Sequence, residues 1–226
     1  MPAEKRFQEK LDKHPGVLTE AQLWINTTVY SLIVFIVILT YYFIQSQSLE
    51  LRTFNRVFAD TGLVIIGFSL AMSSICYFWD FADKYIIYRK HLGLVGFAYI
   101  LTHGVVSLFF MSDLFPFPTY YTSEKQLIPF IAALVSLLIF IFMAAISNKY
   151  AIREIGGQRW RILMRTGFIA YALGIFHFGI KGLPYWWRWF MGQGKYTTPS
   201  MGLIVFLFGA IVIVLRTKLW FATRPS

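Results

Sequence analysis

Long apolar runs alternate with short polar segments along most of the chain. Six runs lie at about residues 24–45, 57–79, 93–111, 127–147, 162–181 and 199–219. A helix of roughly 20 residues crosses a hydrocarbon core of about 30 Å, so each run predicts one transmembrane helix. The strands of a membrane barrel would alternate between apolar and polar residues, whereas these runs are continuously apolar. The pattern predicts an all-α integral membrane protein, with a six-helix transmembrane bundle over residues 24–220.

The two ends of the chain differ from the runs between them. Residues 1–23 have no apolar stretch and carry four acidic residues among their lysines. This composition excludes a signal or transit peptide. We expect residues 1–23 to form a cytosolic amphipathic lead-in and residues 221–226 to form a cytosolic tail.

The positions of lysine and arginine predict how the bundle lies in the membrane. If the N-terminus is inside, the inner segments hold fifteen lysines and arginines and the outer loops hold six. Positive charge gathers on the cytoplasmic side of membrane proteins. We therefore expect both termini to be cytoplasmic, in a multi-pass protein of the plasma (inner cell) membrane.

The amino-acid composition limits the kinds of molecule that the protein is expected to bind. The chain is 57% hydrophobic and only 14% charged, and its net charge is +10. The basic residues lie between apolar runs rather than in a basic domain with base-stacking aromatics, so membrane lipids are expected partners and nucleic acid is not. Cys76 is the only cysteine, which excludes an intrachain disulfide and a cluster of thiolate ligands.

Two histidines lie inside apolar runs, His103 in the third and His177 in the fifth. An ionisable side chain in hydrocarbon is costly and marks a functional site by default. Helical rise places the two residues at similar depths, between the midplane and the outer leaflet. Two imidazoles from different helices can bind a haem iron from both faces, an arrangement that suits electron transfer. The alternatives are that each histidine only bonds across a helix interface, or that the pair binds zinc, which usually takes three or four protein ligands.

Residues near the two histidines fit a flat ring. Gly96, Gly104 and Gly174 are small enough to let a macrocycle or another helix approach closely. Lys181 follows His177 by one turn and could meet a haem propionate, or it could simply reach water from the helix end.

The acidic residues favour electron transfer over transport. All eleven lie outside the predicted spans or at their ends, with Asp60 at the start of the second span. A proton-coupled transporter usually needs a buried carboxylate, and this pattern predicts none. A proton or metal channel with histidine gates remains the alternative from another class.

Three segments resemble a known family, the ferric-reductase-like transmembrane domain, and most closely its STEAP metalloreductases. The string from Arg89 to Leu94, followed by an aromatic span and His103, resembles the third helix of that domain. A second set resembles the fifth helix, and Tyr196–Pro199 resembles the start of the sixth. The second set consists of Trp160, Arg161, Gly167, Tyr171, Phe176 and His177.

The resemblance implies a specific chemistry. It implies one b-type haem with His103 and His177 as axial ligands, and an inner FAD or FMN site. The candidate flavin-site residues are Arg89, Lys90, His91, Trp160 and Arg161. Electrons would pass from a cytosolic flavin reductase or a reduced flavin to an outer ferric or cupric chelate. Homotrimers occur in the family.

The acceptor and the donor each leave alternatives open. Arg188, Lys195 and Tyr196 could collect an anionic metal chelate at the outer face, whereas the tryptophans of residues 186–189 could simply anchor their loop. The family also includes the haem subunit of a bacterial periplasmic methionine sulfoxide reductase system, so an outer protein partner is an alternative acceptor. No Gly-x-Gly-x-x-Gly motif follows a strand, so we expect no NAD(P)H-binding domain, and a membrane quinol is an alternative donor.

The position thirteen residues before His177 bears on the number of haems. It holds Met164, where the NADPH oxidases of the same family carry a second histidine. This departure argues against a second haem.

Overall fold

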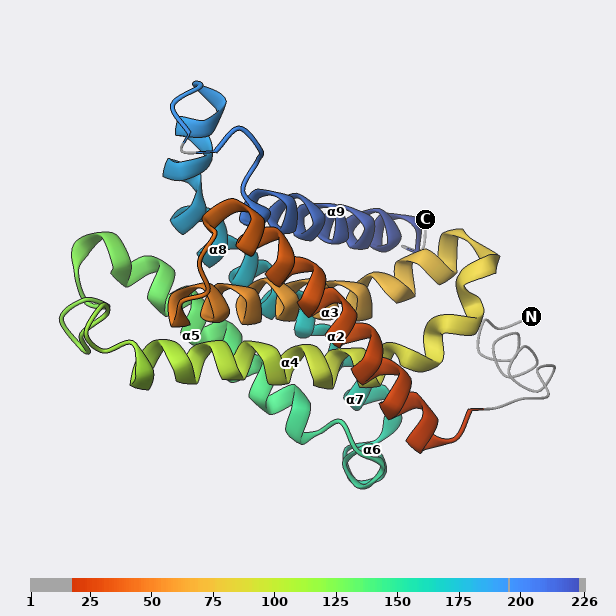
Figure 1. Cartoon of the computed structure of the whole chain (residues 1–226). Helices are drawn as coiled ribbons and strands as arrows, with labels where there is room; N and C mark the ends of the chain where they lie inside the picture. Colours follow the sequence, from red (N-terminus) through yellow and green to blue (C-terminus); the bar gives the residue numbers. More distant parts are fainter. Residues whose placement is uncertain (1–17, 195, 224–226) are drawn as a thin grey trace.

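The computed structural model describes residues 18–194 and 196–223 (Figure 1). Across these residues all regular structure is helical, and six helical segments are long and apolar enough to cross a membrane. The predicted all-α, six-span architecture is therefore confirmed. The predicted lead-in and tail fall largely on residues 1–17 and 224–226, outside the described residues, and the direction of the termini remains a prediction.

The observed boundaries agree with the predicted spans, with one large difference. In chain order the elements are α2 (Glu20–Ser46), α3 (Leu51–Phe78), η1 (Asp80–Tyr88), α4 (Arg89–Val105), η2 (Val106–Phe110), α5 (Glu124–Ala145), α6 (Lys149–Ile155), α7 (Gly157–Arg165), α8 (Gly167–Phe190) and α9 (Met201–Ala222). The fifth span ends at Phe190 rather than at residue 181, so Trp186 and Arg188 lie in α8 and not in an outer loop. The Trp186 side chain is buried and lies 4.9 Å from the Phe206 ring, so it packs within the protein and does not anchor a loop.

Capping residues explain where several helices begin. Thr19 Oγ1 accepts a hydrogen bond from Gln22 N, and Gln22 Oε1 accepts one from Thr19 N, which forms a capping box before α2. Ser200 Oγ accepts from Leu203 N at the start of α9. These side chains satisfy amide groups that the first turn of a helix leaves without partners.

Helix α3 is the central element, because α2, α4, α8 and α9 all pack against it. Its closest neighbour is α4, and glycines make that approach possible. A Cβ atom on Gly96 would lie 2.7 Å from Ile66 Cγ1 and 2.9 Å from Ile66 N. Gly96 therefore serves the contact between two helices, which is one of the two roles predicted for it.

One acidic residue lies elsewhere than predicted. Asp60 falls well inside α3 rather than at the start of a span, and it is only 1% exposed. The statement that every acid lies outside the spans or at their ends is therefore wrong. The error arose because α3 begins at Leu51, six residues before the apolar run that the sequence displays.

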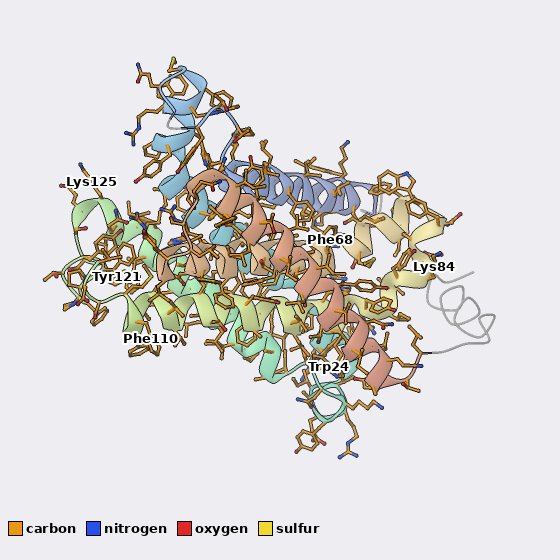
Figure 2. The ribbon with its side chains drawn as sticks, viewed as in Figure 1. Trp24, Phe68, Lys84, Phe110, Tyr121 and Lys125 are labelled. Atoms are coloured by element: carbon orange, nitrogen blue, oxygen red, sulfur yellow. The ribbon has the colours of Figure 1, made fainter. Side chains whose placement is uncertain are left out.

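The two ends of the bundle can be recognised in Figure 2. Phe110, Tyr121 and Lys125 lie at one end, and Lys84 lies at the other. We call the end with Tyr121 and Lys125 the outer end, after the orientation that the charge distribution predicts.

Candidate functional site

Four spans surround the two membrane histidines. Helix α3 packs against both α4 and α8, and α5 also packs against both. Helices α4 and α8 are thus held by the same two neighbours. His103 is on α4 and His177 is on α8, so the arrangement brings the two histidines to one four-helix group.

The His103 ring is oriented by α3. Its Nδ1 atom lies 3.0 Å from the main-chain oxygen of Asn55 and 3.0 Å from Asn55 Oδ1. Both partners are acceptors, so Nδ1 carries the proton and donates it. The Asn55 amide group donates in turn to Ser107 Oγ at 2.8 Å and to Met111 Sδ at 3.3 Å. Asn55 therefore connects the histidine to the end of the same span.

The His177 ring is oriented by α5. Its Nδ1 atom lies 2.7 Å from the main-chain oxygen of Pro129. A carbonyl oxygen can only accept, so this Nδ1 also carries the proton. In each imidazole the lone pair is then on Nε2, and neither Nε2 atom has a hydrogen-bond partner among the described residues.

The two histidines lie at matching depth. Asn55 is the fifth residue of α3 and Pro129 is the sixth of α5, and both helices begin at the outer end. The two partners are thus roughly 6 to 8 Å inside the helix starts.

This set of donor atoms fits a haem. Two neutral imidazoles with free Nε2 atoms supply two ligands, and a haem brings its other four nitrogen ligands itself. The described residues contain no group of three or more His, Cys, Asp or Glu that could hold a bare metal ion. The hydrogen bonds from Nδ1 to carbonyl and amide oxygens are the outer-shell contacts that orient ligating histidines.

The chain leaves α-helical geometry three residues after His103. Residues Val106–Phe110 form a π-helical turn, a feature found frequently at functional sites. Within this turn, Ser107 bonds both to Asn55 Nδ2 and, through its main-chain oxygen, to the Tyr121 hydroxyl. The turn thus joins the histidine network to the outer loop.

Lys181 lies near the outer mouth of the site. Its ammonium group is 3.5 Å from the Tyr120 hydroxyl and 5.3 Å from the centre of the same ring. Burial raises the pKa of Tyr120 above its ordinary value, so the hydroxyl stays neutral and accepts from the lysine. Lys181 is close enough to both His103 and His177 to act on them electrostatically.

The predicted inner residues separate into different surroundings. Lys90 Nζ lies 3.0 Å from Glu20 Oε1 and His91 Nε2 lies 3.2 Å from the same oxygen, so this pair holds α4 against the start of α2. The Trp160 indole donates to the main-chain oxygen of Ile146 at 2.9 Å, just after α5. Arg161 is exposed on α7.

Arg89 has different neighbours from the other predicted flavin-site residues. Its charge acts on Arg216 of α9, and the charge of Arg216 acts on Arg165 at the end of α7. The Arg216 guanidinium also lies 4.4 Å from the centre of the Phe168 ring. None of the three arginines has an ion pair within the described part of the chain. Sequence reasoning missed Arg165 and Arg216 as members of this group.

The predicted outer metal-chelate residues are described only in part. The Arg188 guanidinium donates to the Pro184 main-chain oxygen at 3.3 Å and lies over the Tyr185 ring. Tyr196 is half-buried, and Lys195 lies outside the described residues. Their assembly into one site stays a prediction.

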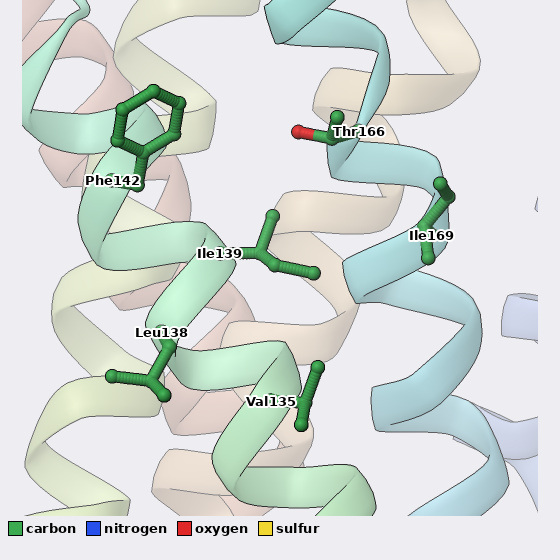
Figure 3. Close-up of a pocket in the computed structure, with 6 residues that line it drawn as sticks. All are labelled: Val135, Leu138, Ile139, Phe142, Thr166 and Ile169. Atoms are coloured by element: carbon green, nitrogen blue, oxygen red, sulfur yellow. The ribbon is translucent and has the colours of Figure 1, made fainter.

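A hollow between α5 and α8 lies on the outside of the bundle (Figure 3). It has a volume of about 350 Å³, and all of its lining residues except Thr166 are apolar: Val135, Leu138, Ile139, Phe142, Thr166 and Ile169. Leu138 and Ile169 are more than half exposed. An open apolar groove of this kind suits lipid chains and does not contain the histidines.

Asn55 and Pro129 are the site residues that the sequence did not reveal. Asn55 lies before the apolar run at 57–79, and the acceptor of Pro129 is a main-chain oxygen that every residue possesses. The available signal for Asn55 was the spacing of His103 and Ser107, which places two polar groups on one face of a helix.

The relatives of this chain include several bacterial proteins that are named as heme-binding subunits. The chain is 24% identical to the protein-methionine-sulfoxide reductase heme-binding subunit MsrQ of Rhodospirillum rubrum over 57% of this chain and 61% of the relative. It is 27% identical to the MsrQ protein of Ralstonia nicotianae over 61% and 57%, respectively. For the MsrQ protein of Herminiimonas arsenicoxydans the values are 32% identity over 56% and 51%. The chain thus spans only about half to three fifths of the length of these relatives.

The family comparison covers the central spans. The model of the family described as "Ferric reductase like transmembrane component" matches residues 58–175, slightly more than half of the chain. The matched range includes His103 and ends two residues before His177. The relatives carry the MsrQ name rather than a STEAP name, so only the broader part of the predicted resemblance is confirmed. From this match, the chain belongs to the ferric reductase like transmembrane component family.

Proposed function

We propose that this chain is the haem-binding membrane subunit of a two-part reductase, and that it carries electrons from an inner donor to a protein partner at the outer face. The observation that carries the proposal is the pair of imidazoles at matching depth. Each donates from Nδ1 to an oxygen and keeps its Nε2 lone pair without a partner in the part of the chain that the structure describes. The printed names of the relatives, which call them heme-binding subunits, support the same cofactor for this chain.

Bound between His103 and His177, a b-type haem would accept and release one electron at a time. The protein's own residues set the conditions for that chemistry. Asn55 and Pro129 fix the direction of the two rings, and the surrounding apolar spans exclude water. Lys181 supplies a positive charge near both rings, where it would favour the acidic edge of a haem.

At the inner end, the proposed electron donor is a reduced flavin, free or carried by a flavin reductase. Arg216 lies near enough to both Arg89 and Arg165 to be repelled by each, none of the three has a carboxylate partner in the described residues, and a phosphate group would relieve that repulsion. Lys90 and His91 already contact Glu20. We therefore place the phosphate of the flavin against the three arginines, rather than against the whole set predicted from the sequence.

At the outer end, the names of the relatives favour a protein acceptor over a metal chelate. The partner would reduce methionine sulfoxide in proteins. Reduction of the sulfoxide to methionine and water consumes two electrons and two protons, so the membrane subunit would deliver two electrons in succession. A STEAP-like metalloreductase is the competing assignment for the acceptor.

The cofactor assignment is tested by optical spectra of the purified protein supplied with haem, recorded before and after dithionite. We expect the sharp reduced bands of a b-type haem, and their loss in His103→Ala and in His177→Ala. His91→Ala is the matched control, because it removes a buried histidine from the inner start of α4, twelve residues before His103. A colourless protein that conducts ions would contradict the proposal and favour a channel.

The acceptor is tested by mixing the reduced protein with two oxidants in separate experiments. One is chelated ferric ion, and the other is the oxidised catalytic subunit of a bacterial protein-methionine-sulfoxide reductase. We expect rapid reoxidation by the catalytic subunit and slow reoxidation by the chelate. Rapid reoxidation by ferric chelate alone would favour a metalloreductase instead.

A further inference from the structure

A buried carboxyl group lies within α3, away from the histidines. Asp60 is 1% exposed, and its Oδ2 atom accepts a hydrogen bond of 2.8 Å from the Tyr42 hydroxyl of α2. Its other oxygen, Oδ1, is buried and has no hydrogen-bond partner in the described residues. A buried polar atom without a partner is costly, so the position calls for an explanation.

The surroundings of Asp60 contain few charges. On its own helix, Arg56 is the nearest charged residue, but it is exposed and forms no ion pair with Asp60. From α2, Tyr42 faces the carboxyl and Tyr41 lies beside it, with its hydroxyl donating to the Pro199 main-chain oxygen. Helix α9 carries no titratable residue before Arg216.

The other helices that pack against α3 do not neutralise Asp60 either. The titratable groups of α4 from Tyr99 outward and of the whole of α8 are Tyr99, His103, Tyr171, His177, Lys181, Tyr185 and Arg188. None of them forms a hydrogen bond or an ion pair with Asp60. Among the described residues, no ion pair therefore offsets a negative charge on the Asp60 carboxyl.

Asp60 is close in depth to the histidine pair. It follows Asn55, the partner of His103, by five residues on the same helix, which corresponds to an axial rise of roughly 7.5 Å. This rise is the separation along the helix axis, and charges with little water between them interact over longer distances than they do in water. An electron arriving between the histidines would raise the affinity of Asp60 for a proton.

Asp60 lies nearer to the outer end of α3 than to the inner end. It is the tenth of the 28 residues of this helix, roughly 14 Å from the outer start and roughly 27 Å from the inner end. On α3 the exposed Arg56 lies one turn outward of Asp60. The proton source nearest to the carboxyl is therefore water at the outer face.

We propose that Asp60 is a proton-exchange site that couples electron transfer to proton uptake from the outer face. When one electron from the inner donor reaches the haem site, the Asp60 carboxylate binds one proton from water at the outer face, and an O–H bond forms at Oδ1 while Oδ2 keeps its hydrogen bond from the Tyr42 hydroxyl. When the electron leaves to the outer acceptor, that bond breaks and the proton returns to the same side. This proposal rests on the proposed haem function and adds a proton to each electron.

The direct test is a reduced-minus-oxidised infrared spectrum of the haem-loaded protein. We expect a carbonyl band of a protonated carboxylic acid on reduction, and its loss in Asp60→Asn. Asp113→Asn removes an exposed outer acid and is the matched control, which should keep the band. A haem-containing wild-type protein without such a band would overturn the proton-exchange proposal and leave the proposed function intact.

A second readout is the midpoint potential of the haem as a function of pH. We expect the potential of the wild type to fall as pH rises, and the potential of Asp60→Asn to be flatter. The same slope in both proteins would overturn the proposal.

If Asp60→Asn does not fold, Tyr42→Phe provides the second variant. It removes the hydrogen-bond donor and keeps the carboxyl, so the infrared band should persist at a shifted frequency. An unshifted band would show that the titrating acid is not Asp60.

Discussion

Replacement of Asn55 by alanine tests the histidine site through a residue that would not itself bind iron. The change removes the Oδ1 acceptor 3.0 Å from His103 Nδ1 and the amide donor to Ser107 and Met111. The main-chain oxygen of residue 55 remains 3.0 Å from the same Nδ1 atom. The ring should therefore keep one of its two acceptors and lose part of its orientation.

The expected magnitude follows from that partial loss. Removal of an outer-shell partner of a metal ligand typically weakens metal binding by about 10- to 100-fold. Because one acceptor is retained, we expect a loss of haem affinity near the lower limit, about tenfold, which corresponds to about 1.4 kcal/mol. The unpaired Ser107 hydroxyl should also lower the free energy of unfolding by about 1 kcal/mol.

The assay is a titration of the haem-free protein with haem, followed by absorbance. Asn26→Ala is the matched control, because Asn26 also bonds across helices, to the Tyr88 hydroxyl at 3.1 Å, but lies far from the histidines in the bundle. Equal haem affinities of Asn55→Ala, Asn26→Ala and the wild type would refute the assigned role of Asn55. They would also weaken the case for His103 as a ligand.

Three further changes test the packing and the outer mouth. Gly96→Ala should lower the free energy of unfolding by about 1 to 3 kcal/mol in a denaturation experiment, because the new Cβ would collide with backbone and side-chain atoms of α3. Gly104→Ala is the control and should be neutral or stabilising, because the nearest atom to its new Cβ would lie at 3.6 Å. Lys181→Gln should lower the midpoint potential of the bound haem, because it removes a nearby positive charge. Lys125→Gln, at the exposed start of α5, should leave the potential unchanged. Equal potentials in the wild type and both variants would contradict the position given to Lys181. Tyr171→Phe should lower the free energy of unfolding by about 1 kcal/mol in the same denaturation experiment, since the buried Tyr171 hydroxyl donates to a main-chain oxygen of α3 at 3.1 Å. An unchanged free energy of unfolding would show that this hydrogen bond makes no net contribution to stability.

The sequence predicted the spans well because membrane crossing imposes a long apolar run on each helix. The prediction failed where a helix extends beyond its apolar run and includes polar residues. Asn55 and Asp60 precede or begin the run at 57–79, yet both are buried within α3. At the other extreme, aromatic and basic residues continue α8 to Phe190, where the composition suggested a loop.

The candidate site was predictable only for side chains with distinctive chemistry. His103 and His177 stand out in hydrocarbon because no acidic residue, lysine or arginine is central to their spans. The partners of a charge depend on how helices pack, and that information is absent from local composition. Lys90 and His91 therefore looked like ligand-binding residues beside Arg89, although both contact Glu20 in the fold.

The glycine contact between α3 and α4 also determines the aim of a distant side chain. Gly96 and His103 lie seven residues apart on one face of α4, and they meet α3 at Ile66 and Asn55, respectively. A slip of α4 by a single residue would carry the imidazole about 1.5 Å along the membrane normal and turn it by roughly 100°. The tight contact at Gly96, two turns away, thus sets the direction of the His103 ring. The register that it fixes decides whether the ring points toward Asn55 or past it.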